Sequence, residues 1–138
     1  MDFKHTIPVA RPADEVFAFV SDSSNNPQWQ NGMQSCTWTS DGPIAVGSTY
    51  DQKARFMGRD IVSRFVVTDL QPGRSISIET TESTFPIQVT RSVEPDGDGC
   101  SVTAHIRGQP TGLLKLFSGM VPMGVRKDYS KLKALLEG

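Results

Sequence analysis

The side chains that could carry chemistry are few in this sequence, and they do not form a known catalytic motif. His5 alternates with Phe3 and Ile7 on one face of an extended segment, so it could point into an interior and act as a general base near neutral pH. A backbone carbonyl at a sheet edge would satisfy the same imidazole equally well. His105 alternates outward beside Arg107, which indicates a surface position. With no other histidine near either one, the sequence gives no support for a metal site.

Arg91 is the most informative of these residues. By parity it shares the inward face of its segment with Val89 and Val93, and a buried guanidinium without a partner is costly. We therefore expect Arg91 to meet a carboxylate, to reach solvent at the end of its strand, or to bind an acidic ligand. Tyr50 and Gln52 share another inward face and could bind a ligand through hydrogen bonds. Tyr50 could also be a core residue with its hydroxyl at the rim.

Three further residues each have a structural and a functional interpretation. Trp29 either caps a pocket or anchors the chain, and Tyr129 either offers its phenol to the pocket or packs in the core. Asp22 is expected at a helix end or turn rather than as a catalytic acid. The charged run 126–128 is expected on a solvated helix face. The sequence contains no glycine-rich phosphate loop, nucleophile elbow or catalytic pair of carboxylates.

Composition narrows the class of protein. The chain has 138 residues with a formal charge of -1, of which 37% are hydrophobic and 21% charged, so we expect a single domain over residues 1–138. With this net charge, the sequence gives no sign of the basic face that nucleic acids require. No apolar run is long enough to span a membrane. Cys36 and Cys100 fit no metal-binding spacing and are expected to be free buried thiols. Residues 1–10 lack a signal-peptide pattern, so we expect a cytoplasmic protein. We also expect no cofactor and no metal.

These side chains must be held in place by segments in which apolar and polar residues alternate. Alternation predicts strands at residues 3–9, 33–39, 48–57, 60–70, 75–81, 85–93 and 100–107. Helices are predicted at 11–22, as a short turn at 26–29, and over 111–137. Hairpin-length connections imply an antiparallel sheet, and Pro8 suggests that the first strand lies at its edge. Pro122 should kink or interrupt the last helix.

The last helix has one apolar face, which needs a sheet to cover. That face comprises Leu113, Leu114, Phe117, Val121, Val125, Tyr129, Leu132 and Leu136. The inward set of the strands comprises Ile61, Phe65, Val67, Ile76, Ile78, Phe85, Ile87, Val89, Val102, Ala104 and Ile106. One long and two short helices cannot fill a strongly curved sheet of this size. We therefore predict an apolar pocket with a few polar groups between helix and sheet.

Several ordered segments resemble one known superfamily over essentially the whole chain. They are residues 9–17, Asp22, 26–29, 46–48, 67–74, 97–103 and 132–137. In this order they are similar to the START/polyketide-cyclase superfamily (SRPBCC proteins), although Cys100 stands where the family often has threonine. The resemblance implies the α+β helix-grip fold: a curved antiparallel sheet of about seven strands around a long C-terminal helix, with two short helices after the first strand. The superfamily includes carriers of hydrophobic ligands, polyketide cyclases and dehydratases, so it leaves the reaction open.

We expect a soluble protein, monomeric or homodimeric, that binds a small hydrophobic molecule of lipid-, aromatic- or polyketide-like character. The alternative is a polyketide cyclase, aromatase or dehydratase, in which His5, Tyr50, Arg91 or Tyr129 would assist proton transfer in the same cavity. A third class, an interaction module, would have a packed interior. The predicted ligand-binding residues are His5, Trp29, Tyr50, Gln52, Phe65, Ile78, Phe85, Ile87, Arg91, Phe117, Val121, Val125 and Tyr129.

Overall fold

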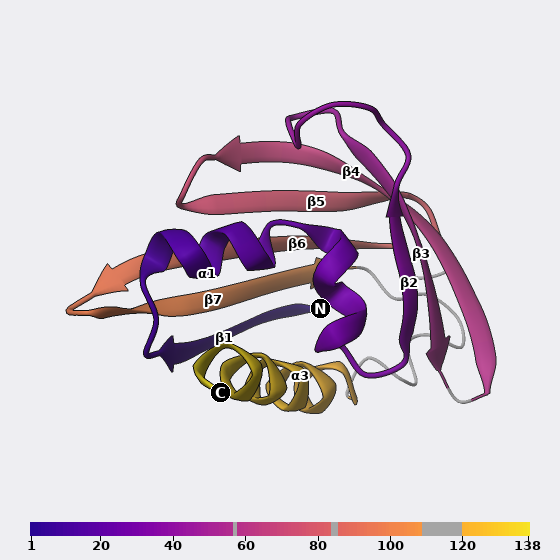
Figure 1. Ribbon diagram of the computed structural model, residues 1–138. Helices are drawn as coiled ribbons and strands as arrows, with labels where there is room; N and C mark the ends of the chain where they lie inside the picture. Colours follow the sequence, from indigo (N-terminus) through magenta and orange to yellow (C-terminus); the bar gives the residue numbers. More distant parts are fainter. Residues whose placement is uncertain (57, 84–85, 109–119) are drawn as a thin grey trace.

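The computed structural model describes residues 1–138 except 57, 84–85 and 109–119. Seven strands form one antiparallel sheet in the order β1-β7-β6-β5-β4-β3-β2 (Figure 1). The strands are β1 (Asp2–Val9), β2 (Met33–Trp38), β3 (Thr49–Phe56), β4 (Arg59–Gln71), β5 (Ser75–Glu82), β6 (Ile87–Asp96) and β7 (Gly99–Gly108). The helices are α1 (Ala13–Val20), the 3₁₀ helix η1 (Ser23–Gln28) and α3 (Val121–Glu137). This is the helix-grip fold that the sequence predicts.

The strands follow the alternation of the sequence, and short turns fix their register. β6 and β7 are joined at Asp96 and Gly99, which pair across the turn. Gly97 has a φ of 59° there, a left-handed conformation that glycine adopts at little cost. β1 is an edge strand that pairs only with β7 among the described strands, as Pro8 indicated. Cys36 and Cys100 are both buried and free, as predicted.

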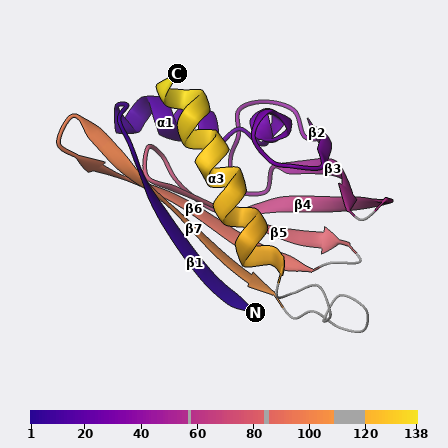
Figure 2. The same cartoon turned by 90° about the horizontal axis from the view of Figure 1, so that it is seen from below.

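The sheet is strongly curved, and the helices lie on its concave side (Figures 1 and 2). The pairing of β4 with β5 shifts register twice, between Arg64 and Phe65 and between Val67 and Asp69. Such bulges bend a strand and increase its twist. α1 packs on β6 and β7 at one end of the trough, η1 packs on β2, and α3 crosses β1. The trough is therefore closed at the α1 end and bridged by α3.

Pro122 lies at the start of α3. In the described part of the chain the helix begins at Val121, so Pro122 lies in its first turn, where an interruption of the predicted helix would place it. Proline is tolerated there because the first N–H groups of a helix have no intrahelical acceptor. No kink is therefore needed at Pro122. The predicted helical residues 111–119 lie outside the described residues.

The apolar core lies at the α1 end of the trough. The fully buried side chains of Val16 and Val20 on α1, Val102 on β7 and Leu132 on α3 belong to one apolar cluster there. Burying each such side chain contributes about 1.5–3 kcal/mol. The remaining length of the trough is incompletely filled.

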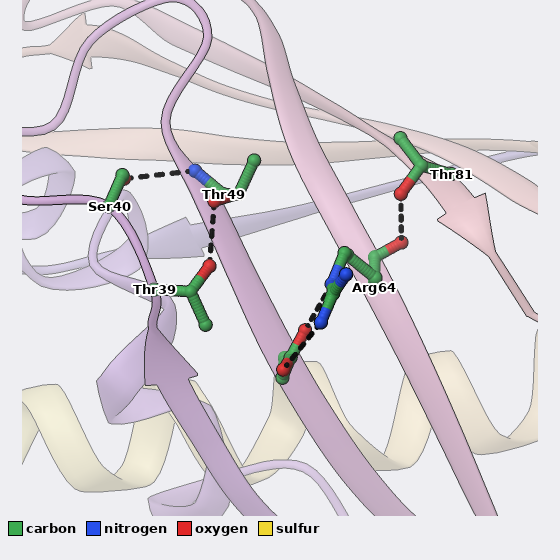
Figure 3. A network of polar contacts seen from close by, with 6 residues as sticks. Thr39, Ser40, Thr49, Arg64 and Thr81 are labelled. Carbon is green, nitrogen blue, oxygen red and sulfur yellow. Dashed lines mark hydrogen bonds and ion pairs between the residues drawn. The ribbon is translucent and has the colours of Figure 1, made fainter.

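The convex face of β2–β5 is polar, in contrast to the concave face. Thr39 and Thr49 share a hydrogen bond of 2.6 Å, and the Ser40 hydroxyl accepts the Thr49 backbone N–H (Figure 3). Arg64 donates from Nε and Nη2 to both carboxylate oxygens of Asp51, an exposed pair on neighbouring strands. Exposed ion pairs of this kind contribute little to stability. Among the described residues, no helix is long and apolar enough to cross a membrane.

Candidate functional site

A cavity of about 340 Å³ lies between α3 and the concave face of the sheet. Its wall is mostly apolar, with a few polar groups, as in many small-molecule sites. Its lining residues on the sheet and just before β1 are Met1, Met33, Tyr50, Gln52, Ala54, Phe56, Ile61, Ser63, Phe65, Ile78, Ile87, Val89, Arg91 and Ile106. Those after η1 and on α3 are Trp29, Gln30, Asn31, Met120, Val121, Gly124, Val125, Asp128 and Tyr129.

Arg91 is the centre of the polar end of the cavity. Its Nε donates a hydrogen bond of 3.1 Å to the Tyr129 hydroxyl, and its guanidinium carbon lies 5.3 Å from the centre of the Trp29 ring. Only 7% of Arg91 is exposed. Burial disfavours the charge, but the neighbouring Tyr129 and Tyr50 phenols outweigh this effect, so the pKa of Arg91 stays above its usual range. The side chain is therefore a buried cation facing the cavity.

Two other donors beside Arg91 are buried without a hydrogen-bond partner in the described part of the chain. They are the indole Nε1 of Trp29 and the hydroxyl of Tyr50. Ser23 lies close enough to the Tyr50 phenol to oppose the rise of its pKa, which burial causes, but the contact lacks hydrogen-bond geometry. The Tyr50 ring is fixed by stacking on Phe65 at 5.0 Å. Buried polar groups are normally satisfied, and the acceptor Asn26 Oδ1 on η1 is a third buried atom without a partner among the described residues.

Asp128 lies on α3 beside the polar end. Its Oδ1 accepts the backbone N–H of Asn31 at 3.0 Å, which ties the helix to the segment after η1. Burial raises the pKa of the Asp128 carboxyl, and its hydrogen bond with Asn31 and nearby cations oppose this rise. Asp128 is not within ion-pair distance of Arg91, and neither is any other carboxylate of the described residues. Asp128 therefore bonds to the Asn31 backbone and interacts with Arg91 only over a longer distance.

The structure brings most of the predicted ligand-binding residues to one cavity. They are Trp29, Tyr50, Gln52, Phe65, Ile78, Ile87, Arg91, Val121, Val125 and Tyr129. Trp29 is fully buried in the wall rather than at the mouth, and the Tyr50 hydroxyl is buried rather than at the rim. Phe85 and Phe117 lie outside the described residues.

His5 is on the inward face but does not line the cavity. Its ring stacks on Phe3 at 6.4 Å and meets the edge of Tyr129 at 6.2 Å. The reason is that α3 crosses β1, so the inward face of this edge strand is covered by the helix. Burial and the nearby Arg126 lower the pKa of His5. His5 is thus a neutral packing residue here, and it has no hydrogen bond to a carbonyl in the described part of the chain.

Sequence reasoning missed Asp128, which the charged run 126–128 placed on a solvated face. Helical spacing from Val121 and Val125 puts Asp128 on their face of α3, and this signal could have identified it. Asp22 is a helix-end residue as predicted: it caps η1 by accepting the Ser24 N–H, and it also accepts the Trp38 indole at 2.8 Å. The described residues contain no group of three metal-ligating side chains.

The sequence model of one protein family matches residues 1–137, which is nearly the whole chain. Its description is "Polyketide cyclase / dehydrase and lipid transport". The chain belongs to this family. It is therefore a member of a group that includes both ligand carriers and enzymes, and its helix-grip fold and apolar cavity agree with that membership. No curated protein sequence matches the chain at significant similarity.

Solved structures share the fold at low sequence identity. TTHA0849 from Thermus thermophilus has a TM-score of 0.82 at 13% identity, covering 97% of this chain and 95% of its own. The Zhui aromatase/cyclase from Streptomyces sp. R1128 has a TM-score of 0.79 at 14% identity, covering 99% and 93%. Major latex-like protein 151 from Panax ginseng has a TM-score of 0.78 at 13% identity, covering 100% and 98%. At these identities the likeness extends to the fold alone.

Proposed function

We propose that the protein binds a small, largely hydrophobic molecule in the cavity between the sheet and α3. The observation that carries this proposal is the cavity of about 340 Å³ itself, because a module that works only through its surface would pack this space. A pocket of this size with an apolar wall suits an aromatic, polyketide-like or lipid-derived molecule. We place this activity in the cytoplasm, in a monomer or homodimer, without nucleic acid.

A second candidate function is cyclisation, aromatisation or dehydration of a polyketide-like chain. The observation that favours it is the hydrogen bond between Arg91 and Tyr129 inside the cavity. A guanidinium can stabilise the enolate that forms when a β-ketone loses a proton, and a phenol beside it can exchange that proton with the substrate. Orientation of a flexible chain in a shaped pocket would supply part of the rate enhancement.

The first test is to fill the cavity from two opposite walls. Gly124 on α3 lines the cavity, and a Cβ built there meets nothing within 4 Å. Gly124→Trp and Ala54→Trp should each lower the affinity for the neutral fluorescent probe N-phenyl-1-naphthylamine by about tenfold or more, since each ring occupies volume that the probe needs. Gly124→Ala is the control: it should bind the probe normally and stabilise the helix by about 0.5–1 kcal/mol. Wild-type affinity in both tryptophan variants would contradict the proposal.

The enzyme candidate has its own test. Wild-type protein and Tyr129→Phe are incubated with a short poly-β-ketone thioester, and the products are followed by mass spectrometry. Cyclisation with loss of water that Tyr129→Phe slows would support catalysis. If the thioester binds but its cyclisation is no faster than in buffer, the carrier function stands and the enzyme candidate is excluded.

A further inference from the structure

Arg91 brings hydrogen-bond donors to the polar end of the cavity. The Trp29 ring lies against the guanidinium, and its indole Nε1, the Tyr50 hydroxyl and the acceptor Asn26 Oδ1 are buried without a partner within the described residues. A guanidinium has five N–H donors and no acceptor, and an indole N–H can only donate. The one hydrogen bond of Arg91 in the described structure goes to a neutral phenol. An occupant that completes this site must therefore bring acceptors.

Arg91 has no ion-pair partner among the described residues, although Asp128, which also lines the cavity, interacts with it over a longer distance. Its guanidinium is a buried cation. Burying a charge costs free energy unless it is paired and hydrogen-bonded. The planar fork of an arginine matches a carboxylate, to which it can donate two parallel hydrogen bonds. One acidic group can accept from both arms of the guanidinium, and Asp128 beside the site would oppose a second negative charge.

The opposite end of the cavity is apolar. Ile87 lies four residues before Arg91 on β6, and both line the cavity, so they are about 13 Å apart along an extended strand. Ile61 on β4, together with Met120 and Val121 at the start of α3, completes this end of the wall. The cavity thus has a cationic end and an apolar end, separated by roughly the length of a ten-carbon chain or a two- to three-ring aromatic body.

From this polarity we propose that the ligand is a monoanionic amphiphile. Its acidic group, a carboxylate or an ionised enol, binds Arg91, and its apolar body extends toward Ile87 and α3. The inference rests on the proposed binding function and adds the chemical class and the orientation of the ligand. Tyr129 holds the guanidinium in place through its hydroxyl and is a positioning residue.

The experiment uses two fluorescent probes that share one ring skeleton and differ by an acidic group. 1-Anilinonaphthalene-8-sulfonate is the anionic probe, and N-phenyl-1-naphthylamine is the neutral one. Each is titrated into the wild type, Arg91→Gln and Arg91→Lys. Arg107→Gln is the matched control, because it removes the same charge from the exposed outer face of β7.

In Arg91→Gln, affinity for the anionic probe should fall about tenfold to a hundredfold, which is the usual effect of losing a hydrogen bond to a charged group. Affinity for the neutral probe should change by less than about threefold, Arg91→Lys should recover part of the loss, and Arg107→Gln should match the wild type. If both probes weaken equally in Arg91→Gln, or neither weakens, the acidic-ligand proposal is overturned while hydrophobic binding stands. If the wild type binds neither probe, the proposed function itself fails.

A measurement on the wild type covers the case in which the Arg91 variants do not fold. Decanoate and 1-decanol are compared as competitors of the bound neutral probe. Decanoate should displace it at a concentration at least about tenfold lower than 1-decanol, because only decanoate carries a negative charge to pair with Arg91. Equal potency of the two competitors would overturn the acidic-ligand proposal, and the proposed binding function would stand.

Discussion

Asp128 combines two roles at the residue scale, since it faces the cavity and also holds the backbone of Asn31. Burial raises the pKa of its carboxyl above the ordinary value of 3.8. The folded protein therefore binds this proton more tightly than the unfolded chain does. As the pH rises from about the ordinary value through the raised one, ionisation of Asp128 lowers the free energy of unfolding.

This sign gives a prediction for Asp128→Asn. The amide oxygen can still accept the Asn31 N–H, and the buried negative charge is gone. The melting temperature of the variant should exceed that of the wild type at pH 7, and the difference should shrink as the pH is lowered toward 4. Thermal unfolding by circular dichroism at a series of pH values measures it, with exposed Asp41→Asn as the charge control. A difference that grows toward acid pH would contradict the raised pKa.

At the scale of elements, α3 is held by only part of its surface. Leu132 is fully buried against the strands, whereas Leu135 is 44% exposed on the same helix. Lys133 donates to the Pro8 carbonyl at 2.7 Å, and Glu137 accepts the Ala10 backbone N–H at 2.8 Å. The C-terminal half of α3 is thus anchored on β1 and the turn after it, and its N-terminal half bridges the cavity.

The matched pair Leu132→Ala and Leu135→Ala tests this difference along the helix. Leu132→Ala should lower the free energy of unfolding by about 2–5 kcal/mol, because it removes buried surface and leaves a void. Leu135→Ala should change it by less than about 1 kcal/mol. Urea titrations followed by tryptophan fluorescence give both values. Equal losses in the two variants would mean that α3 packs in a different rotation.

Alternation in the sequence was sufficient to predict the strands, because side chains of a strand alternate between faces whatever its neighbours are. It therefore placed Arg91 inward correctly. It could not show that Arg91 meets Tyr129, since that contact depends on the rotation of α3 over the sheet and spans 38 positions. The same limit explains His5: parity puts it inward, but only the path of α3 decides that helix rather than cavity covers it.

For the molecule as a whole, the labelling rate of the buried Cys36 thiol measures how readily the folded structure opens around β2. Burial raises its pKa to about 11, so at pH 8 only about one thiol in a thousand is a reactive thiolate. In the Cys100→Ser background, labelling of Cys36 by a disulfide reagent should be slow in the native protein and fast in denaturant. Saturating N-phenyl-1-naphthylamine should slow it further, since binding stabilises the closed form. Labelling as fast as that of a free peptide would show that the β2 edge is open to solvent.

The order of elements along the chain has a consequence for biosynthesis. α3 follows all seven strands, yet it is the wall that covers the concave apolar face. While the ribosome translates this protein, the strands leave the exit tunnel before α3 does, and their inner face stays exposed until residues 121–137 have emerged. Such a nascent intermediate is a natural client for ribosome-associated chaperones. Synthesis that pauses ahead of α3 should increase aggregation more than an equal pause earlier in the chain.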